Sequence, residues 1–224
     1  REDARAQLAG NIGHSPLCLL TPHLNPLPQG ERNDLASLSP EWERTGVREP
    51  LVLELSSFLL HNFSQIKYSP NISVWTNFYP DHLNKYHGLK DYFADKQNIL
   101  RYQKPGDTAI LNLDDPKLQK SKIKNLKSKI LFFSLRKKVK NGAYLNNGWF
   151  VFSDGGKTER IAQISDTKLL GEHNQANILA AICAAKAAGV SSKNIAKVIK
   201  EWRGLPNRLE LVREIKGVKW FNDC

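Results

Sequence analysis

The amino-acid sequence predicts an α/β protein with a mainly parallel sheet flanked by helices and a small antiparallel annex. Short apolar runs at residues 51–53 and 72–75 end in polar or turn residues, which is typical of strands buried on both faces of a parallel sheet. A helical segment that carries Lys96 follows the second of these runs, and two further helical segments come later in the chain. The pair Asn147-Gly148 separates two further apolar runs and indicates a hairpin, which accounts for the annex. We expect strands 51–55 and 72–76 to be neighbours in the sheet.

The first fifty residues differ from the rest of the chain. Residues 1–8 resemble the end of a helix, and the glycines around Asn11 suit either a tight turn beside a ligand or a plain loop. Residues 14–50 carry six of the eleven prolines, which indicates a functional loop or a disordered insertion, and we favour an insertion. We therefore expect the end of an incomplete upstream segment at 1–13, a proline-rich insertion at 14–50 and the main domain at 51–224.

The main domain alternates helical and strand patterns. Apolar residues at helical intervals predict a helix at 88–103, which contains Lys96, and an alanine-rich run predicts the surest helix of the chain at 174–188. A third helix at 191–202 begins with its own serine cap. The predicted strands are 108–113, 130–133, the hairpin arms 143–145 and 149–152, and the pair 209–214 and 218–222.

Composition limits the class of protein. The 224 residues are 41% hydrophobic and 25% charged, which is enough for one sizeable core or for a domain plus fragments. The three cysteines are widely separated, so neither a disulfide framework nor a Cys-x-x-Cys metal site is indicated. No apolar run approaches the roughly 20 residues of a membrane span, and the first residues do not follow the plan of a signal peptide. We therefore expect a cytoplasmic protein.

The net charge of +11 raises the question of a nucleic-acid partner. The lysines between residues 117 and 140 are scattered in a segment with few aromatic residues, which favours a solvated basic surface. The same field would attract an anionic nucleotide. We predict neither a nucleic-acid nor a membrane partner.

Polar side chains stand where the first two strands of the main domain end. Glu54 follows the first strand, and Asp81 and His82 follow the second. In open α/β sheets the ligand crevice lies at the carboxyl ends of the strands, and carboxylate and imidazole donors suit a divalent ion that also holds phosphate oxygens. A solvated strand end and a simple turn remain the alternative interpretations.

Eight sequence blocks in order resemble the Mur ligases of peptidoglycan synthesis, and the Glu-Leu-Ser-Ser-Phe block is similar to that of the members that add D-glutamate. The resemblance covers residues 7–13 and 51–223. The blocks are Ala9-Gly10-Asn11-Ile12-Gly13, Leu53-Glu54-Leu55-Ser56-Ser57-Phe58, Thr76-Asn77 to Asp81-His82-Leu83, Tyr92 to Lys96, Leu111-Asn112-Leu113-Asp114-Asp115-Pro116, Gly171-Glu172-His173-Asn174-Gln175-Ala176-Asn177, Gly204-Leu205-Pro206-Asn207-Arg208-Leu209-Glu210 and Asn222-Asp223.

The resemblance implies the middle, ATP-binding domain of a magnesium-dependent amide ligase. Such an enzyme would add D-glutamate to UDP-N-acetylmuramoyl-L-alanine through an acyl phosphate. By the family pattern Glu54 would hold one Mg²⁺ and His82 a second. Lys96 would be carbamylated by carbon dioxide, which replaces a cation with an anionic oxygen donor.

The same resemblance implies residues for the other ligands. Asn174, Asn177, Arg208 and Asp223 would contact ATP. Asn11 and Ser56 would contact the UDP-linked substrate. The alternative interpretations are local: a surface lysine at Lys96, a helix cap at Asn174 and an ion pair at Arg208.

The sequence also departs from the family pattern. A glycine-rich phosphate loop is expected upstream of Gln7, a carboxy-terminal domain is expected after Cys224, and Cys224 itself stands in place of a serine. Leu59 stands where the D-glutamate-adding members usually have glutamine. We therefore expect a central-domain fragment that is inactive alone.

Two rival functions stay open at this point. Another Mur ligase or a folylpolyglutamate synthase would share the fold and the reaction. A non-enzymatic remnant would explain the lack of a phosphate loop.

Overall fold

The computed structural model describes residues 7–9, 51–81, 84–120, 126–205 and 207–223. The chain divides into two compact units, residues 1–65 and 66–224. In the first unit, β1 (Gln7–Ala9) pairs in parallel with β2 (Leu51–Leu53), and α3 (Ser57–Ile66) follows β2. The expected turn at 9–13 and insertion at 14–50 lie outside the described residues, apart from Ala9.

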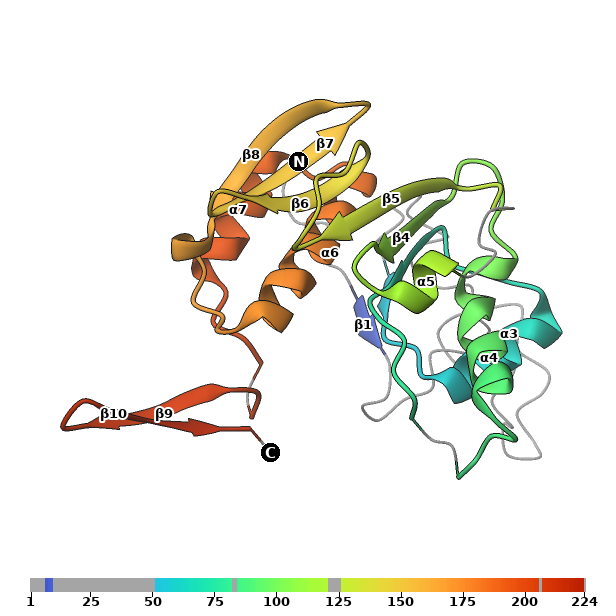
Figure 1. Ribbon diagram of the computed structural model, residues 1–224, viewed down its shortest axis with the longest axis horizontal. Helices are drawn as coiled ribbons and strands as arrows, with labels where there is room; N and C mark the ends of the chain where they lie inside the picture. The colour runs from blue at the N-terminus through green and yellow to red at the C-terminus, as the bar shows by residue number, and fades with distance from the viewer. Residues whose placement is uncertain (1–6, 10–50, 82–83, 121–125, 206, 224) are drawn as a thin grey trace, which may run out of the picture. The chain divides into compact units, whose positions relative to one another are not determined.

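The second unit is built on a six-stranded sheet with the order β3-β4-β5-β6-β7-β8 (Figure 1). The first four strands are parallel neighbours, and β7 and β8 are antiparallel. A mostly parallel sheet flanked by helices confirms the predicted fold class. The strands are β3 (Ile72–Trp75), β4 (Thr108–Asn112), β5 (Lys129–Ser134), β6 (Gly142–Asn146), β7 (Trp149–Asp154) and β8 (Lys157–Gln163).

Helices cover both faces of this sheet, which explains the continuous apolar runs in the sequence. On β4, Ile110 faces a core that includes residues of α6 (Glu172–Ala187) and α7 (Ser192–Glu201). Its neighbours Ala109 and Leu111 face the opposite core, against α4 (Leu89–Arg101) and α5 (Pro116–Lys120). Successive strand residues point to opposite faces, so consecutive residues in the middle of such a strand are apolar when both faces are covered.

The three predicted helices are confirmed. The prediction at 88–103 corresponds to α4, that at 174–188 to α6 and that at 191–202 to α7, with boundaries that differ by one or two residues. Ser191 caps α7, because its Oγ accepts a hydrogen bond of 3.3 Å from the Asn194 N–H. Among the described residues, no helix is long and apolar enough to cross a lipid bilayer.

The hairpin at Asn147-Gly148 is also confirmed. Both residues have positive φ, 48° and 77°, as a type I′ turn requires. This annex is continuous with the parallel sheet, because β6 pairs with β5 on one side and with β7 on the other. The chain ends in a second hairpin, formed by β9 (Glu210–Ile215) and β10 (Val218–Asn222), which makes a separate two-stranded sheet.

Two predictions about the strands are wrong. Strands 51–55 and 72–76 are not hydrogen-bonded neighbours in the described residues, because β2 pairs with β1 and β3 pairs with β4. Gln7 and Leu8 lie in a strand, not at the end of a helix. Three residues are too few to show a helical or strand periodicity, so the strand conformation of this segment depends on its pairing with β2.

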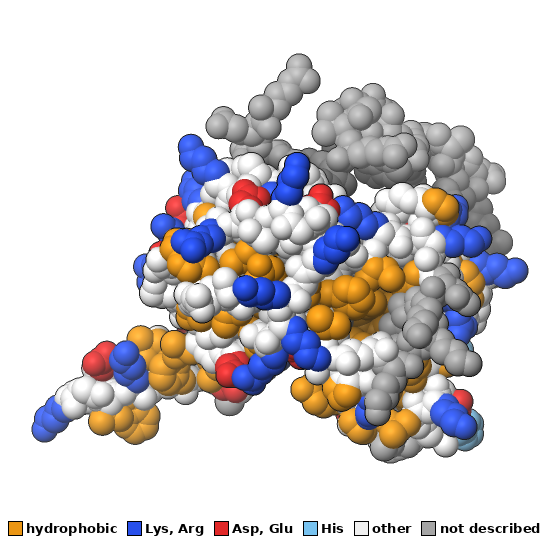
Figure 2. All heavy atoms as spheres, turned by 45° about the horizontal axis from the view of Figure 1, so that its top comes forward, with side chains coloured by type: hydrophobic (Ala, Val, Ile, Leu, Met, Phe, Trp, Pro, Cys, Tyr) orange, Lys and Arg blue, Asp and Glu red, His pale blue; other side chains and the backbone are white. Residues whose placement is uncertain are grey.

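Basic side chains are spread over the surface. Figure 2 shows lysine and arginine side chains scattered over the visible face, with acidic and apolar side chains between them. Several are paired: Lys129 with Asp154 at 3.2 Å, and Lys186 with Glu159 at 2.9 Å. This distribution favours a solvated basic surface.

Cys183 on α6 is expected to resist alkylation in the folded chain. It is fully buried, and burial raises the pKa of its thiol to about 12. The folded state therefore favours the neutral thiol, so this contribution to stability is complete below the unfolded pKa of 9.0 and is lost as the pH rises toward 12. Mass spectrometry after iodoacetamide treatment at pH 8 should find Cys183 unmodified, and modified once urea is added. Labelling at equal rates in both conditions would contradict the burial.

Candidate active site

The parallel strands place three loops at one edge of the sheet. Residues 76–81 follow β3, Asp114 and Asp115 follow β4, and residues 135–141 follow β5. This is the carboxyl edge, where the sequence predicts the ligand site. Asp81 therefore belongs to the expected edge, whereas His82 lies outside the described residues.

Lys96 lies near the loop that follows β3. Its side chain is partly buried within α4, and its Nζ lies 5.2 Å from the centroid of the Tyr92 ring. Burial lowers the pKa of the Lys96 ammonium, while the nearby Asp81 carboxylate acts in the opposite direction. Burial also raises the pKa of the Tyr92 phenol, with smaller contributions from Asp81 and Tyr86. The structure thus places the partly buried Lys96 side chain next to the Tyr92 ring and near Asp81.

An aromatic cluster includes Tyr92 and reaches the loop after β3. The ring centroids of Phe78 and Tyr92 are 5.2 Å apart, and those of Tyr86 and Tyr92 are also 5.2 Å apart. Trp75 and Phe93 complete the cluster at 5.1 Å from each other. Rings that contact one another on several sides restrict the positions of the loop and of the first half of α4.

Side chains at the end of β4 bind the backbone of the same loop. The Phe78 N–H donates to Asp115 Oδ2 at 2.7 Å, and Asn112 Nδ2 donates to the Thr76 carbonyl at 2.9 Å. Trp75 Nε1 donates to the Asn77 carbonyl at 2.9 Å. The loop after β3 is therefore held by side chains on both of its sides.

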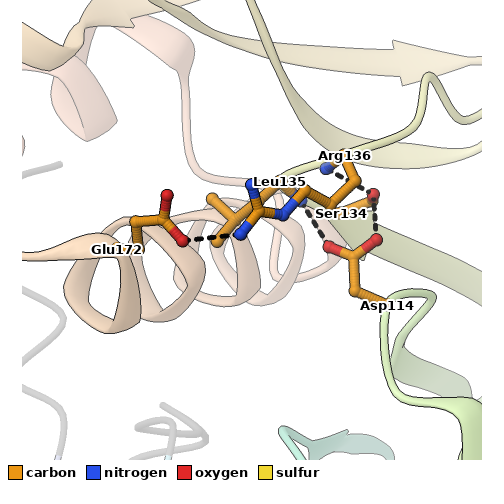
Figure 3. A network of polar contacts seen from close by, with 5 residues as sticks. All are labelled: Asp114, Ser134, Leu135, Arg136 and Glu172. Atoms are coloured by element: carbon orange, nitrogen blue, oxygen red, sulfur yellow. Dashed lines mark hydrogen bonds and ion pairs between the residues drawn. The ribbon is translucent and has the colours of Figure 1, made fainter.

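A second network joins the ends of β4 and β5 to the start of α6 (Figure 3). Asp114 accepts hydrogen bonds of 2.7 Å from Ser134 Oγ and from the Leu135 N–H. Arg136, on the same loop, reaches Glu172 on α6 at 2.7 Å. The ion pair is exposed, so its contribution to stability is small.

The predicted nucleotide residues on α6 have different surroundings. Asn174 Nδ2 donates to the Leu170 carbonyl at 2.7 Å, which fits the alternative of a local role at the helix start. Asn177 is exposed and lines a groove of about 390 Å³ between α6 and α7. The rest of the groove is mostly apolar and includes Ile178, Ile182, Ile195, Val198 and Trp202.

Arg208 and Asp223 are brought to the same end of the β9–β10 hairpin. Asp223 Oδ1 accepts a hydrogen bond of 3.1 Å from the N–H of Leu209, the residue that follows Arg208. Asn222 Nδ2 donates to Asn207 Oδ1 at 2.8 Å. Two blocks that are 14 residues apart in the sequence thus form one structural unit.

In the first unit, Glu54 and Ser56 follow β2. Glu54 is exposed. Ser56 precedes α3, and its Oγ accepts a hydrogen bond of 3.3 Å from the Leu59 N–H, as a helix cap does. Asn11 lies outside the described residues, as does His82. Within the part of the chain that the structure describes, no three His, Cys, Asp or Glu residues gather as a ready metal site.

The tripeptide Gly156-Lys157-Thr158 has the same residues as the end of a phosphate-loop motif, but it does not form a phosphate loop. Gly155 and Gly156, with φ of 63° and 93°, form the tight turn between the antiparallel strands β7 and β8. A phosphate loop instead connects a strand to a helix whose N–H groups face the phosphates. The position of Lys157 at the start of β8 excludes that role.

Sequence reasoning missed Asp115 and Arg136. Asp114-Asp115-Pro116 lies in one of the family blocks, but no role was predicted for it, although two acidic residues before a proline at a strand end were an available signal. The contact partners are 37 and 36 residues away in the chain, so no local pattern reveals them.

Comparisons with known proteins agree with this architecture. Residues 39–185 match the family "Mur ligase middle domain". A UDP-N-acetylmuramoylalanine--D-glutamate ligase of Pelotomaculum thermopropionicum is 39% identical over 183 residues, which cover 82% of this chain and 40% of that protein. One of Acidobacterium capsulatum is 37% identical over 174 residues, covering 77% of this chain and 37% of that protein. The chain thus spans about 40% of the length of these relatives.

The fold of this chain resembles that of solved structures. MurF ligase from Thermotoga maritima, in complex with ADP, matches with a TM-score of 0.55 and 22% identity over 78% of this chain and 40% of that one. MurF from Acinetobacter baumannii matches with a TM-score of 0.58 and 16% identity over 97% of this chain and 50% of that one. The family match covers most of the chain, and the fold agrees with it: this chain belongs to the Mur ligase family.

Proposed function

We propose that this chain is part of an ATP-dependent ligase that adds D-glutamate to UDP-N-acetylmuramoyl-L-alanine. The observation that carries the proposal is the 39% identity, over 183 residues, to a ligase named for that reaction. The Glu-Leu-Ser-Ser-Phe block at residues 54–58 supports D-glutamate over the amino acids added by other Mur ligases.

The proposed reaction has two steps. A carboxylate oxygen of the UDP-linked substrate attacks the γ-phosphorus of ATP, so that ADP leaves and an acyl phosphate forms. The amine nitrogen of D-glutamate then attacks the acyl carbon, inorganic phosphate leaves, and the nitrogen loses a proton. Such chemistry depends on positioning and on neutralising charge around the phosphoryl group.

Lys96 is proposed to act as a carbamate. Only a neutral amine attacks carbon dioxide, and the burial that lowers the Lys96 pKa increases the neutral fraction. The ammonium first loses one proton, and the neutral nitrogen then bonds to the carbon of carbon dioxide and releases a second proton, so a cation becomes an anion with two oxygen atoms. The partly buried position of Lys96 beside Asp81 and Tyr92 fits this chemistry.

Magnesium is the cofactor that these donors suit. By the family pattern Glu54 would hold one Mg²⁺ and His82 a second, and the carbamate oxygens of Lys96 would be further metal ligands, since hard divalent ions prefer oxygen ligands and share them with phosphates. When bound, the metal would neutralise charge on the phosphoryl oxygens. An unmodified ammonium at Lys96 could not serve, which makes the carbamate a requirement of the proposal.

ATP is proposed to contact Asn174, Asn177, Arg208 and Asp223. An exposed amide at the rim of a mostly apolar groove is suitable for a heteroaromatic base, and Asn177 occupies such a rim. Asn11 and Ser56 are proposed to contact the UDP-linked substrate, as in the family pattern.

The test uses a full-length ligase that carries these residues. Phosphate release should require ATP, Mg²⁺, UDP-N-acetylmuramoyl-L-alanine and D-glutamate together, and L-glutamate should not replace D-glutamate. Preference for another amino acid would assign the chain to a different Mur ligase, and ATP hydrolysis without an amine acceptor would refute the ligase proposal.

The 224-residue chain alone should release no phosphate above background in the same assay. Its sequence contains no complete Gly-x-x-x-x-Gly-Lys-Thr/Ser loop. Removing one preorganised electrostatic element costs about 2.7–4 kcal/mol, or roughly a hundred- to thousandfold in rate, and a whole phosphate cradle comprises several such elements. Substrate-dependent turnover by this chain would show that another part of it binds the phosphates.

A further inference from the structure

We propose that Asp115 is a positioning residue that fixes the loop at residues 76–81 and thereby places Asp81 beside Lys96. The inference rests on the proposed function for its catalytic consequence, while its structural part stands on contacts within this chain. Nothing in the family match or in the names of the relatives assigns a role to this aspartate.

The first argument is the way in which the Asp115 carboxylate is used. Oδ2 accepts a hydrogen bond of 2.7 Å from the Phe78 N–H, and Oδ1 accepts bonds of 2.8 Å and 3.1 Å from the N–H groups of Lys117 and Leu118. Asp115 is only 8% exposed. A buried carboxylate is stable where charge-assisted hydrogen bonds satisfy both of its oxygens, as they do here.

The second argument is the rigidity of what Asp115 joins. On one side it caps α5, where Pro116 occupies the first helical position that favours proline. On the other side it holds Phe78, which is 5% exposed and packs against Tyr92 and Phe93. Asp115 therefore ties the loop after β3 to the end of β4, across 37 residues of sequence.

The third argument is that the loop leads directly to the candidate site. Asp81 lies three residues after Phe78, and its carboxylate is close enough to Lys96 and Tyr92 to affect the pKa of both side chains. Asn112, three residues before Asp115, holds the Thr76 carbonyl at 2.9 Å. Two side chains from one strand end thus fix both the start and the middle of the loop, so Asp81 has a short and constrained path to its position.

Asp115→Asn separates the two functions of this side chain. Asparagine has a single acceptor oxygen and is itself a good helix cap, so it can satisfy Lys117 and Leu118. Its amide nitrogen then faces the Phe78 N–H, donor against donor. The substitution removes the tie to the loop and keeps the cap on α5.

Amide hydrogen exchange in this chain tests the tie. In Asp115→Asn, exchange at Phe78 should accelerate roughly 10- to 100-fold, while Lys117 and Leu118 stay within a few-fold of the unmodified chain. The matched control is Asp114→Asn, which removes the same charge one residue earlier and should accelerate exchange at Leu135 but not at Phe78. Unchanged exchange at Phe78 in Asp115→Asn, or equal acceleration in both variants, would overturn the proposal. If Asp115→Asn does not fold, Asp115→Ser, which also caps but is too short to reach Phe78, replaces it.

Kinetics of a full-length ligase with the same residues test the consequence. Asp115→Asn should lower kcat roughly 10- to 100-fold, as when a group that lines an active site is displaced by about 1 Å, with the KM for ATP within about twofold. A folded Asp115→Asn enzyme with unchanged kcat would refute the positioning role. An unmodified enzyme that does not use D-glutamate would instead refute the proposed function, and the exchange result would still stand.

Discussion

Lys96→Ala in a full-length ligase carrying these residues should abolish ligation, with kcat falling at least about a hundred- to thousandfold. The proposed carbamate supplies an anionic donor that alanine lacks. Lys96→Arg should be equally inactive, because a guanidinium stays protonated and forms no carbamate. Formate or acetate at millimolar concentration should partly restore the activity of Lys96→Ala by returning a carboxylate to the vacated space. Coupled measurement of phosphate release gives all three rates.

Lys117→Ala is the matched control for this experiment. Lys117 is also placed over an aromatic ring of the same cluster, with its Nζ 5.0 Å from the Phe78 centroid. Its removal should change kcat only slightly, and carboxylic acids should have no effect on that variant. Equal losses in Lys96→Ala and Lys117→Ala, or activity of Lys96→Ala without an added acid, would show that Lys96 acts only as a surface charge.

Gly142→Ala should destabilise the fold by about 2 to 6 kcal/mol. Gly142 begins β6 with φ of 129°, a conformation that residues with a side chain rarely adopt. A Cβ at this position would lie 1.8 Å from the Phe132 carbonyl oxygen and 2.7 Å from the Phe132 nitrogen. The conformational strain and the forced displacement of β5 each cost about 1–3 kcal/mol. Urea unfolding followed by circular dichroism measures the loss.

Gly148→Ala separates the two contributions. Gly148 also has a positive φ, 77°, but a Cβ there would meet nothing within 4 Å. Its substitution should therefore cost only the conformational part, about 1 kcal/mol. If both alanine variants lose the same stability, the close approach of β5 and β6 is not important for the fold.

The sequence allowed good prediction wherever a local signal decides the structure. Asn147-Gly148 determines its turn because few other residue pairs adopt positive φ at both positions. Ser191 determines the start of α7 because its side chain satisfies a free N–H group. The apolar run of β4 also predicts that its successive residues contact opposite cores, since a strand with helices on both faces has no solvent-exposed side.

Strand order is where the sequence was insufficient. The apolar run at 51–53 has the same character as that at 72–75, and nothing in either determines that β2 pairs with β1 while β3 pairs with β4. The helix α3 was missed although a signal existed: Ser56 is a good cap, and the buried residues Leu60 and Phe63 are three apart. Short helices beside a motif are easily read as part of that motif.

The candidate site was predictable only in its chemically distinctive members. Lys96 stood out through the family resemblance, and its role stays a prediction, to which the structure adds that the side chain is partly buried near Asp81. Asp115 and Arg136 could not be found in the same way, because their importance comes from long-range contacts with Phe78 and Glu172. A positioning residue acts through groups that only the folded chain brings into contact with it, so local sequence patterns identify it poorly.

The β9–β10 hairpin affects how the chain will withstand proteases. Its strands are exposed almost throughout, and Val212, Val218 and Trp220 are each more than half exposed. A two-stranded ribbon with so little buried surface opens at low cost, whereas the six-stranded sheet must unfold as a unit. Arg213, Lys216 and Lys219 lie within this ribbon. Trypsin would therefore cleave there well before it reaches the basic residues of β5 and β8, and the sheet with its helices would survive as the resistant part of the second unit.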